Sequence, residues 1–223
     1  MRKGEPDPRP RAPVRQLAHA ELAPVRRTSL LTALRPPPLD FHQLFISRRS
    51  QRSLRRARLK DELGWLSYAT APQFVAVHEG LPRSRRPALA SGALHAVTPI
   101  LFSGGGRPRA WRCRPEAAVV DLLAITDGEA IRRLRAEAAE LLPGCPGCDL
   151  IVVVVDDELL AAAYEDPDSL AWRDAGTLFQ TLALAATALG LGFCPLGILG
   201  NAALDGLAAQ DRFRALGMAV VGA

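Results

Sequence analysis

The stretch from Thr177 to Leu191 contains no charged residue, and it constrains the fold more than any other segment. It continues a helical pattern that starts at Asp168, and Gly190 and Gly192 mark its end. A helix that is apolar on all sides is stable in a water-soluble protein only when other parts of the protein surround it. We therefore expect one long buried helix in this region.

A run of four valines within Asp149–Asp156 predicts a central strand, because strands buried on both faces are continuously apolar. Residues 95–102 and 109–114 also have strand character, and the glycine-rich segment between them indicates a hairpin. Residues 70–90 show no periodicity, so we expect a loop there. The other periodic segments predict helices over 41–53, 57–69 and 129–142 and a last strand over 218–221. The expected fold class is α+β, with a sheet covered by helices.

The front of the chain differs in composition from the rest. Residues 1–40 contain eight of the 18 prolines, which exclude a helix of any length there. Residues 1–60 hold 15 Lys and Arg against four acids (+11), whereas the remainder holds 13 against 19 (−6). We expect residues 1–40 to form a Pro/Arg-rich extended arm, either disordered or laid over a neighbouring surface, followed by a folded domain over 41–223.

A cluster at Arg48-Arg49-Ser50-Gln51-Arg52 places three guanidinium groups and a hydroxyl within five residues. It lies at the end of the first helix or on it; Asp40 caps this helix, and Phe41, Leu44 and Phe45 are spaced to bury one side. Guanidinium groups bind phosphate through bidentate, charge-assisted hydrogen bonds. A solvated charged face or a nucleic-acid patch uses the same residue types, so the cluster alone does not decide between these roles.

Two further segments narrow the choice. Ala88–His95 is a turn of small residues that lets the backbone approach a flat ligand closely. The second segment begins at Ala175-Gly176 and ends at Gly192, and it contains a Leu-Ala-Ala and a Leu-Gly-Leu-Gly pattern. With the arginine cluster, these segments resemble the FMN-dependent nitroreductase superfamily, and within it the SagB-type (thiazoline/oxazoline) dehydrogenases. The family's R-R-S-x-R, P-S-A-G-A-L-H/Y-P and A-G-x-x-x-Q-N-L motifs are matched in order across residues 41–223.

This resemblance implies an FMN-binding nitroreductase-like fold with a mixed, mainly antiparallel sheet, and a homodimer with FMN at the subunit interface. Hydride would pass from NADH or NADPH through flavin N5 to a small acceptor. Because the cofactor carries out this chemistry, the sequence names no catalytic residue. The implied cofactor-binding residues are Arg48, Arg49, Ser50 and Arg52 at the phosphate and ribityl chain, Ala90, Ser91, Gly92 and His95 at the isoalloxazine ring, and Pro195, Leu196 and Gly197 at its polar edge.

The chain departs from the family pattern at two places. Leu89 and Ala90 replace the Pro and Ser that begin the middle motif, so an expected ring contact is missing. Azoline-oxidising members carry a Lys-Tyr pair before the buried helix, but the only lysines here are Lys3 and Lys60, which argues against azoline oxidation. A non-catalytic flavin or small-ligand binder therefore stays open. A basic-armed nucleic-acid binder is a further alternative, although few aromatic residues are interleaved with the arginines for base stacking.

Cys145-Pro-Gly-Cys148 has the spacing of a redox or zinc motif. The sequence contains no second pair of this kind, so we expect a tight turn and no metal site. Four cysteines are too few for a disulfide framework at this length, which is typical of a reducing compartment. With no membrane-spanning run and no secretory signal pattern, we expect a cytoplasmic location.

Overall fold

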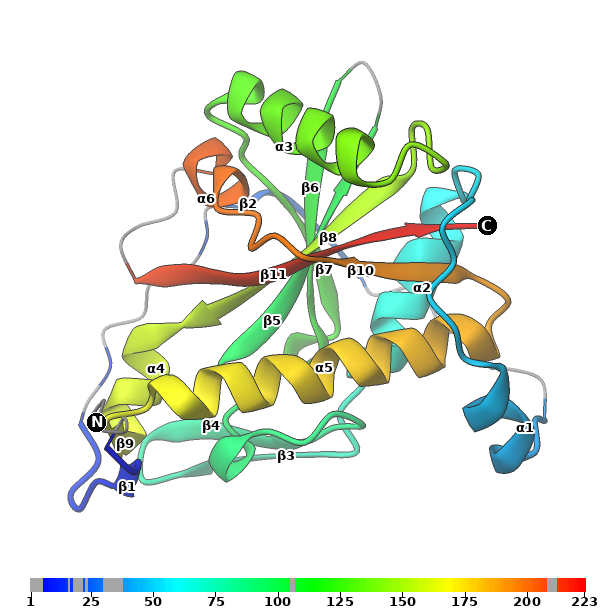
Figure 1. The fold of residues 1–223 in the computed structure, drawn as a ribbon. Helices are drawn as coiled ribbons and strands as arrows, with labels where there is room; N and C mark the ends of the chain where they lie inside the picture. The colour runs from blue at the N-terminus through cyan, green and yellow to red at the C-terminus, as the bar shows by residue number, and fades with distance from the viewer. Residues whose placement is uncertain are drawn as a thin grey trace, which may run out of the picture.

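The computed structural model describes residues 6–15, 17, 22, 24–29, 38–104, 107–207 and 212–223. At its centre is a seven-stranded sheet whose neighbouring strands are all antiparallel (Figure 1), which confirms the expected mainly antiparallel arrangement. In spatial order the strands are β10 (Gly192–Leu196), β11 (Phe213–Gly222), β8 (Asp149–Asp156), β5 (Val97–Ser103), β6 (Arg109–Arg114), β7 (Val119–Leu123) and β2 (Pro24–Ser29).

Helices cover both faces of this sheet. The α-helices are α1 (Phe41–Ser47), α2 (Leu59–Thr70), α3 (Gly128–Leu141), α4 (Asp157–Ala163), α5 (Asp168–Ala188) and α6 (Ala202–Gly206). Two short 3-10 helices, η1 (Ser91–Ala93) and η2 (Pro115–Ala117), flank β5 and β6. α5 and α3 lie on opposite sides of the sheet (Figure 1). The predicted helices and strands at α2, α3, α5, β5, β6 and β8 are confirmed, with small shifts at their ends.

The valine run lies in β8, between β5 and β11. Because side chains alternate along a strand, Val152 and Val154 join the core beneath α3 and α6, while Val153 and Val155 join the core beneath α2 and α5. All four valines are fully buried. The continuous apolar run is therefore explained by a strand that supplies two hydrophobic cores, one on each face of the sheet.

The long helix α5, which is uncharged from Thr177 onward, packs against the sheet and α2. The indole nitrogen of Trp65 on α2 donates to the carbonyl of Leu182 at 3.1 Å, deep in the core. On its other side, Thr181 and Leu184 border a groove of about 420 Å³ that is shared with Leu44 of α1. Within one chain, α5 is therefore covered on one side and open to a largely apolar groove on the other, rather than surrounded as we expected.

Helix α1 does not bury the side that its sequence predicted. Asp40 caps it as expected by accepting from the Gln43 amide at 3.1 Å. However, Phe41 is 72% exposed and Phe45 is 58% exposed, and the two rings stack only on each other. The spacing predicted a helix correctly but not the partner surface, because α1 lies at the edge of the single chain (Figure 1).

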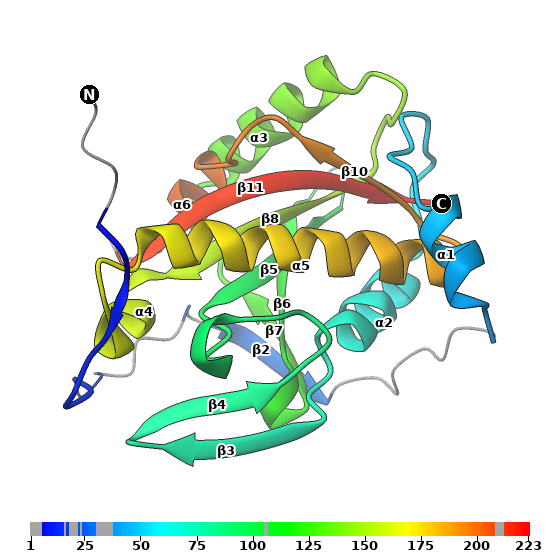
Figure 2. The same cartoon turned by 60° about the horizontal axis from the view of Figure 1, so that its bottom comes forward.

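The segment between residues 70 and 90 is a β-hairpin and not a loop. β3 (Phe74–His78) pairs with β4 (Leu81–Arg85), and both residues of the connecting turn, Glu79 and Gly80, have positive φ. Its residues are mostly exposed and include Pro82, so no alternating apolar pattern reveals the strands. The hairpin lies on the opposite side of the molecule from α3 (Figure 2).

The described parts of the N-terminal arm are extended and paired with the rest of the chain. β1 (Arg9–Pro10) pairs with β9 (Tyr164–Glu165), and β2 forms the edge of the main sheet beside β7. Residues on both sides of position 40 thus share one sheet, and the proposed boundary there stays a prediction. Of the three prolines at 36–38, only Pro38 lies within the described residues. No helix within the described ranges is long and apolar enough to cross a membrane.

Candidate functional site

The arginine cluster lies in an extended segment after α1, held by backbone hydrogen bonds. Arg48 leaves the helix with φ −60° and ψ 121°, so the arginines are not part of it. The Gln51 amide donates to the carbonyl of Phe193 in β10 at 3.3 Å. The Arg55 amide donates to the carbonyl of Ala223 at 2.9 Å, and the Ala223 amide donates back at 2.8 Å. Backbone pairing with the sheet therefore fixes the position of the cluster.

Two glycines allow this segment to approach the body of the protein. A Cβ at Gly144 would overlap the carbonyl oxygen of Arg52, and a Cβ at Gly192 would overlap the Leu54 side chain. The Leu54 amide donates to the Gly144 carbonyl at 3.1 Å, so the chain is bonded at the same point. Any larger residue at either glycine would displace the arginine-bearing segment.

The arginine side chains have no protein partner among the described residues. Arg49, Ser50 and Arg52 are exposed, Arg48 is half-buried, and the guanidinium groups form no hydrogen bond or ion pair within the described ranges. Elsewhere on this chain many arginines are paired with acids, for example Arg212 with Asp156 at 2.6 Å. The cluster at 48–52 thus presents unused cationic donors at the surface.

The start of β10 lies beside this cluster, since the Gln51 amide donates to Phe193 and a Cβ at Gly192 would overlap Leu54. Burial raises the pKa of the Cys194 thiol in β10, and the positive charge of Arg52 lowers it in part. Pro195 and Gly197, which follow directly, are exposed, and Leu196 is half-buried. A Cβ built on Gly197 would meet no atom within 4 Å, so the space in front of it is open. The arginine segment is therefore bonded to the start of the strand whose end leads into Gly197.

The third group, Ala90–Gly92, is fixed to the first half of α5. The backbone amide of Ser91 donates to Asp174 Oδ2 at 2.9 Å, and its hydroxyl donates to Oδ1 at 2.9 Å. Thr177 Oγ1 donates to the carbonyl of Leu89 at 2.7 Å. Asp174 is buried, and burial raises its pKa while the hydrogen bonds from Ser91 lower it in part. α5 therefore clamps the small-residue turn through one carboxylate and one hydroxyl.

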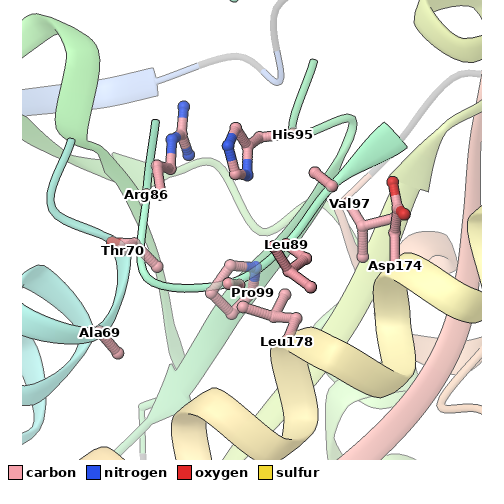
Figure 3. Close-up of a pocket in the computed structure, with 11 residues that line it drawn as sticks. Ala69, Thr70, Arg86, Leu89, His95, Val97, Pro99, Asp174 and Leu178 are labelled. Carbon is pink, nitrogen blue, oxygen red and sulfur yellow. The ribbon is translucent and has the colours of Figure 1, made fainter. Parts of the chain in front are cut away.

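His95 faces a small cavity beneath this turn. The cavity has a volume of about 20 Å³, room for roughly one water molecule, and its walls include Leu89, Asp174 and Leu178 (Figure 3). His95 Nε2 lies 2.8 Å from the carbonyl oxygen of Ser84, which can only accept, so Nε2 carries the proton. Burial and the nearby Arg86 charge lower the pKa of His95 to about 4. The imidazole is neutral at pH 7, and this cavity is too small for a flavin ring.

A single chain does not bring all three groups together. Asp174, which holds Ser91, is 14 residues before the last residue of α5 at Ala188, or about 20 Å along the helix axis. The arginine cluster is bonded to Phe193, beyond the other end of α5. The sequence patterns did not single out Asp174 as the clamp. Its position at the start of the A-G motif, shortly before the uncharged run, was the available signal.

Cys145 and Cys148 form the expected turn. The Cys145 amide donates to the Leu142 carbonyl at 3.1 Å, and the Cys148 amide donates to the Cys145 carbonyl at 3.3 Å. All four cysteines are free and buried, and burial raises the pKa of the Cys148 thiol to about 12. Buried thiols of this kind are poor nucleophiles. The described residues contain no group of three or more His, Cys, Asp or Glu that could hold a metal ion.

Comparison with known proteins agrees with this geometry. The model of the Nitroreductase family matches residues 146–223, which include β8, α5, β10 and β11. The fold is that of the nitroreductases. The resemblance stated from the sequence motifs is thereby confirmed, while the assignment of individual residues to a cofactor stays a prediction.

Three solved structures illustrate the match. A structure described as a nitroreductase from Ralstonia eutropha JMP134 has a TM-score of 0.64 at 13% identity, covering 94% of this chain and 97% of that one. Another, from Anabaena variabilis ATCC 29413, has a TM-score of 0.62 at 19% identity and covers 88% of this chain, which spans only 41% of that longer protein. The E. coli microcin synthetase McbBCD complex with truncated pro-MccB17 bound has a TM-score of 0.57 at 15% identity, covering 84% and 74%. No curated protein sequence matches this chain.

Proposed function

We propose that this protein is an FMN-dependent oxidoreductase that uses NADH or NADPH to reduce a small acceptor. The observation that supports this most strongly is the arginine cluster, whose three guanidinium groups have no protein partner among the described residues. Backbone bonding holds the cluster against the start of β10, on the fold of the nitroreductases. A further structure of this fold, with a TM-score of 0.50 at 15% identity, is described as an oxidoreductase containing FMN.

The described residues fit the phosphate end of FMN. Arg48, Arg49 and Arg52 have no acid among the described residues to neutralise them, so a dianionic phosphate would gain charge-assisted hydrogen bonds without breaking existing ones. Ser50 adds an exposed hydroxyl. The backbone pairing of Gln51 and Arg55 to the sheet fixes these donors in advance, which lowers the entropic cost of binding.

The end of β10 fits the polar edge of a flavin ring. A Cβ at Gly197 would meet no atom within 4 Å, and the glycine carries no side chain that would hold a ring away. Bound FMN would supply the hydride-transfer chemistry, for which this chain offers no side-chain substitute. The role of the protein residues is to bind the phosphate, orient the ring through backbone donors and limit access of water.

A second copy of the chain completes the proposed site. Within one chain, Ala90–Gly92 are held at the other end of α5 from the arginine cluster, so they would reach a ring only on a neighbouring molecule. The exposed Phe41 and Phe45, together with the groove of about 420 Å³ between α1, α2 and α5, provide apolar surface for such a contact. We therefore propose a homodimer. Sedimentation velocity tests it, and a monomer at micromolar concentration would contradict the proposed dimer.

FMN titration followed by flavin fluorescence tests the binding proposal. Losing one charge-assisted contact weakens binding by about tenfold or more, so Arg48→Ala and Arg52→Ala should each raise the Kd by that factor. Arg55→Ala is the matched control, because Arg55 is exposed on the same segment but outside the cluster. The proposal fails if wild-type protein binds no FMN or if all three variants bind it equally.

Stopped-flow mixing of the FMN-loaded protein with NADH or NADPH tests the reaction. Bleaching of the flavin absorbance with at least one donor is expected, followed by reoxidation when a quinone or nitroaromatic acceptor is added. Bound flavin that dithionite reduces but neither nicotinamide reduces would leave a flavin-binding protein and refute the oxidoreductase assignment.

A further inference from the structure

A second cavity, separate from the arginine cluster at 48–52, lies at the end of the sheet under the β3–β4 hairpin. Its volume is about 430 Å³, within the range of small-molecule pockets. Its walls come from β3, β4, the start of β5, the end of β6 and the residues around the start of β11. These segments are far apart in sequence, so only the fold creates the cavity.

The charge of this cavity is positive. Five arginines line it against two acids, Glu116 and Asp156, which gives a formal balance of +3. Asp121 and Glu158 are outside this lining but pair with Arg114 and Arg212. When these two acids are counted as well, the formal balance is still +1. His95, which also lines it, adds no charge at pH 7. The arginines are Arg83, Arg86, Arg112, Arg114 and Arg212.

Both lining acids are already paired. Arg86 contacts Glu116 at 2.9 Å, and Arg212 contacts Asp156 at 2.6 Å. Arg83, in contrast, has no carboxylate partner within the described ranges. Its Nη1 donates to the carbonyl of Gly92, and its buried Nε has no hydrogen-bond partner in the described structure. Arg83 thus lines the cavity with a charge that no carboxylate of the described residues neutralises, and an anionic ligand would pair with its guanidinium group.

The rest of the wall has an apolar part, which indicates that the ligand also has an apolar part. Val75, Val77, Leu94, Leu159 and Phe213 line the cavity together with the arginines. Inorganic phosphate or chloride would leave most of this apolar surface in contact with water. A ligand that combines one oxyanion group with an apolar body would use both the charge and the volume.

We propose that this cavity binds a small organic anion, with a carboxylate or phosphate group held by Arg83 and an apolar body against the hairpin. The site differs from the FMN phosphate surface in every residue, so it does not depend on the arginine cluster at 48–52. Arg83 also bonds to Gly92, so an occupant would contact a side chain that is tied to the turn held by Asp174.

Isothermal titration calorimetry on the full chain, saturated with FMN and at constant ionic strength, tests this proposal. The probes are phenylacetate and phenyl phosphate, which separate a carboxylate from a phosphate ligand, with phenylacetamide as the neutral analogue. We expect at least one anion to bind and the amide to bind about tenfold more weakly or worse. Absence of binding heat with both anions at millimolar concentration would overturn the proposal.

Variants assign the binding to this cavity. Arg83→Gln should weaken binding of the anion about tenfold or more, whereas Arg85→Gln, on the same strand and exposed, should leave it unchanged. Arg48→Gln, in the arginine cluster, distinguishes this site from the FMN surface and should also leave the affinity for the anion unchanged. Circular dichroism checks that each variant is folded, and Arg83→Lys, which keeps the charge, should retain part of the affinity if Arg83→Gln is unstable. Equal losses in Arg83→Gln and Arg85→Gln, or a loss confined to Arg48→Gln, would refute the assignment.

Discussion

A buried carboxyl pair predicts an unusual dependence of stability on pH. Glu62 on α2 and Asp149 at the start of β8 are both fully buried. Burial, followed by the negative charge of Asp149 and a hydrogen bond to it, raises the pKa of Glu62 from 4.5 to about 9. Arg56 and Arg135, at 3.7 and 3.6 Å from Asp149, lower it only in part. Glu62 is therefore protonated in the folded protein at pH 7.

The sign of the effect follows from proton linkage. Below pH 4.5 the folded and unfolded states both hold the Glu62 proton, so its contribution to stability is fully present. Between pH 4.5 and about 9 only the folded state holds it, and the free energy of unfolding falls by about 1.4 kcal/mol per pH unit. Over the interval of about 2.5 units up to pH 7, the loss amounts to about 3 kcal/mol.

Glu62→Gln removes this loss, because an amide cannot ionise and can still donate to Asp149. Urea unfolding followed by circular dichroism at pH 5 and pH 8 should show the variant about 2 to 4 kcal/mol more stable relative to wild type at pH 8 than at pH 5. Glu137→Gln, at an exposed position of α3, controls for the loss of a negative charge. A difference between Glu62→Gln and wild type that is the same at both pH values would refute the reasoning.

Two further substitutions test the geometry of the candidate site. Gly192→Ala should weaken FMN binding severalfold by pushing the Leu54 side chain and its segment outward. Gly128→Ala on α3, whose Cβ meets only the Arg132 side chain at 3.7 Å, should leave FMN binding unchanged, and fluorescence titration of both variants compares them. Asp174→Ala removes both acceptors of Ser91 and should lower the free energy of unfolding by about 1 to 3 kcal/mol, measured by urea denaturation, while an unchanged value would mean that α5 does not hold the turn.

Much of the fold was predictable from local patterns. The valine run in β8 and the uncharged stretch of α5 indicated buried elements, because burial on both faces of a strand or most of a helix removes every charge from the sequence. The Asp40 cap was also readable, since its hydrogen bond spans only three residues. The β3–β4 hairpin was not, because exposed strands need no alternating pattern.

The candidate site was only partly predictable. The R-R-S-x-R cluster is local in sequence, so its residue types alone indicate an anion-binding function. Its position on an extended segment depends on contacts with Phe193 and Ala223, more than 130 residues away along the chain. The clamp from Asp174 to Ser91 likewise joins residues 83 apart.

The sequence by itself determined the α+β class, the buried strand and helix, and the three ordered motifs that resemble the nitroreductases, because each is encoded within a few neighbouring residues. Only the tertiary structure decided that the arginine cluster lies against the start of β10 while Ser91 is bonded to the first half of α5. It alone also gathered Arg83 and four further arginines around one cavity. The physical reason is that pairing between distant strands sets these distances, and no local pattern encodes which strands become neighbours.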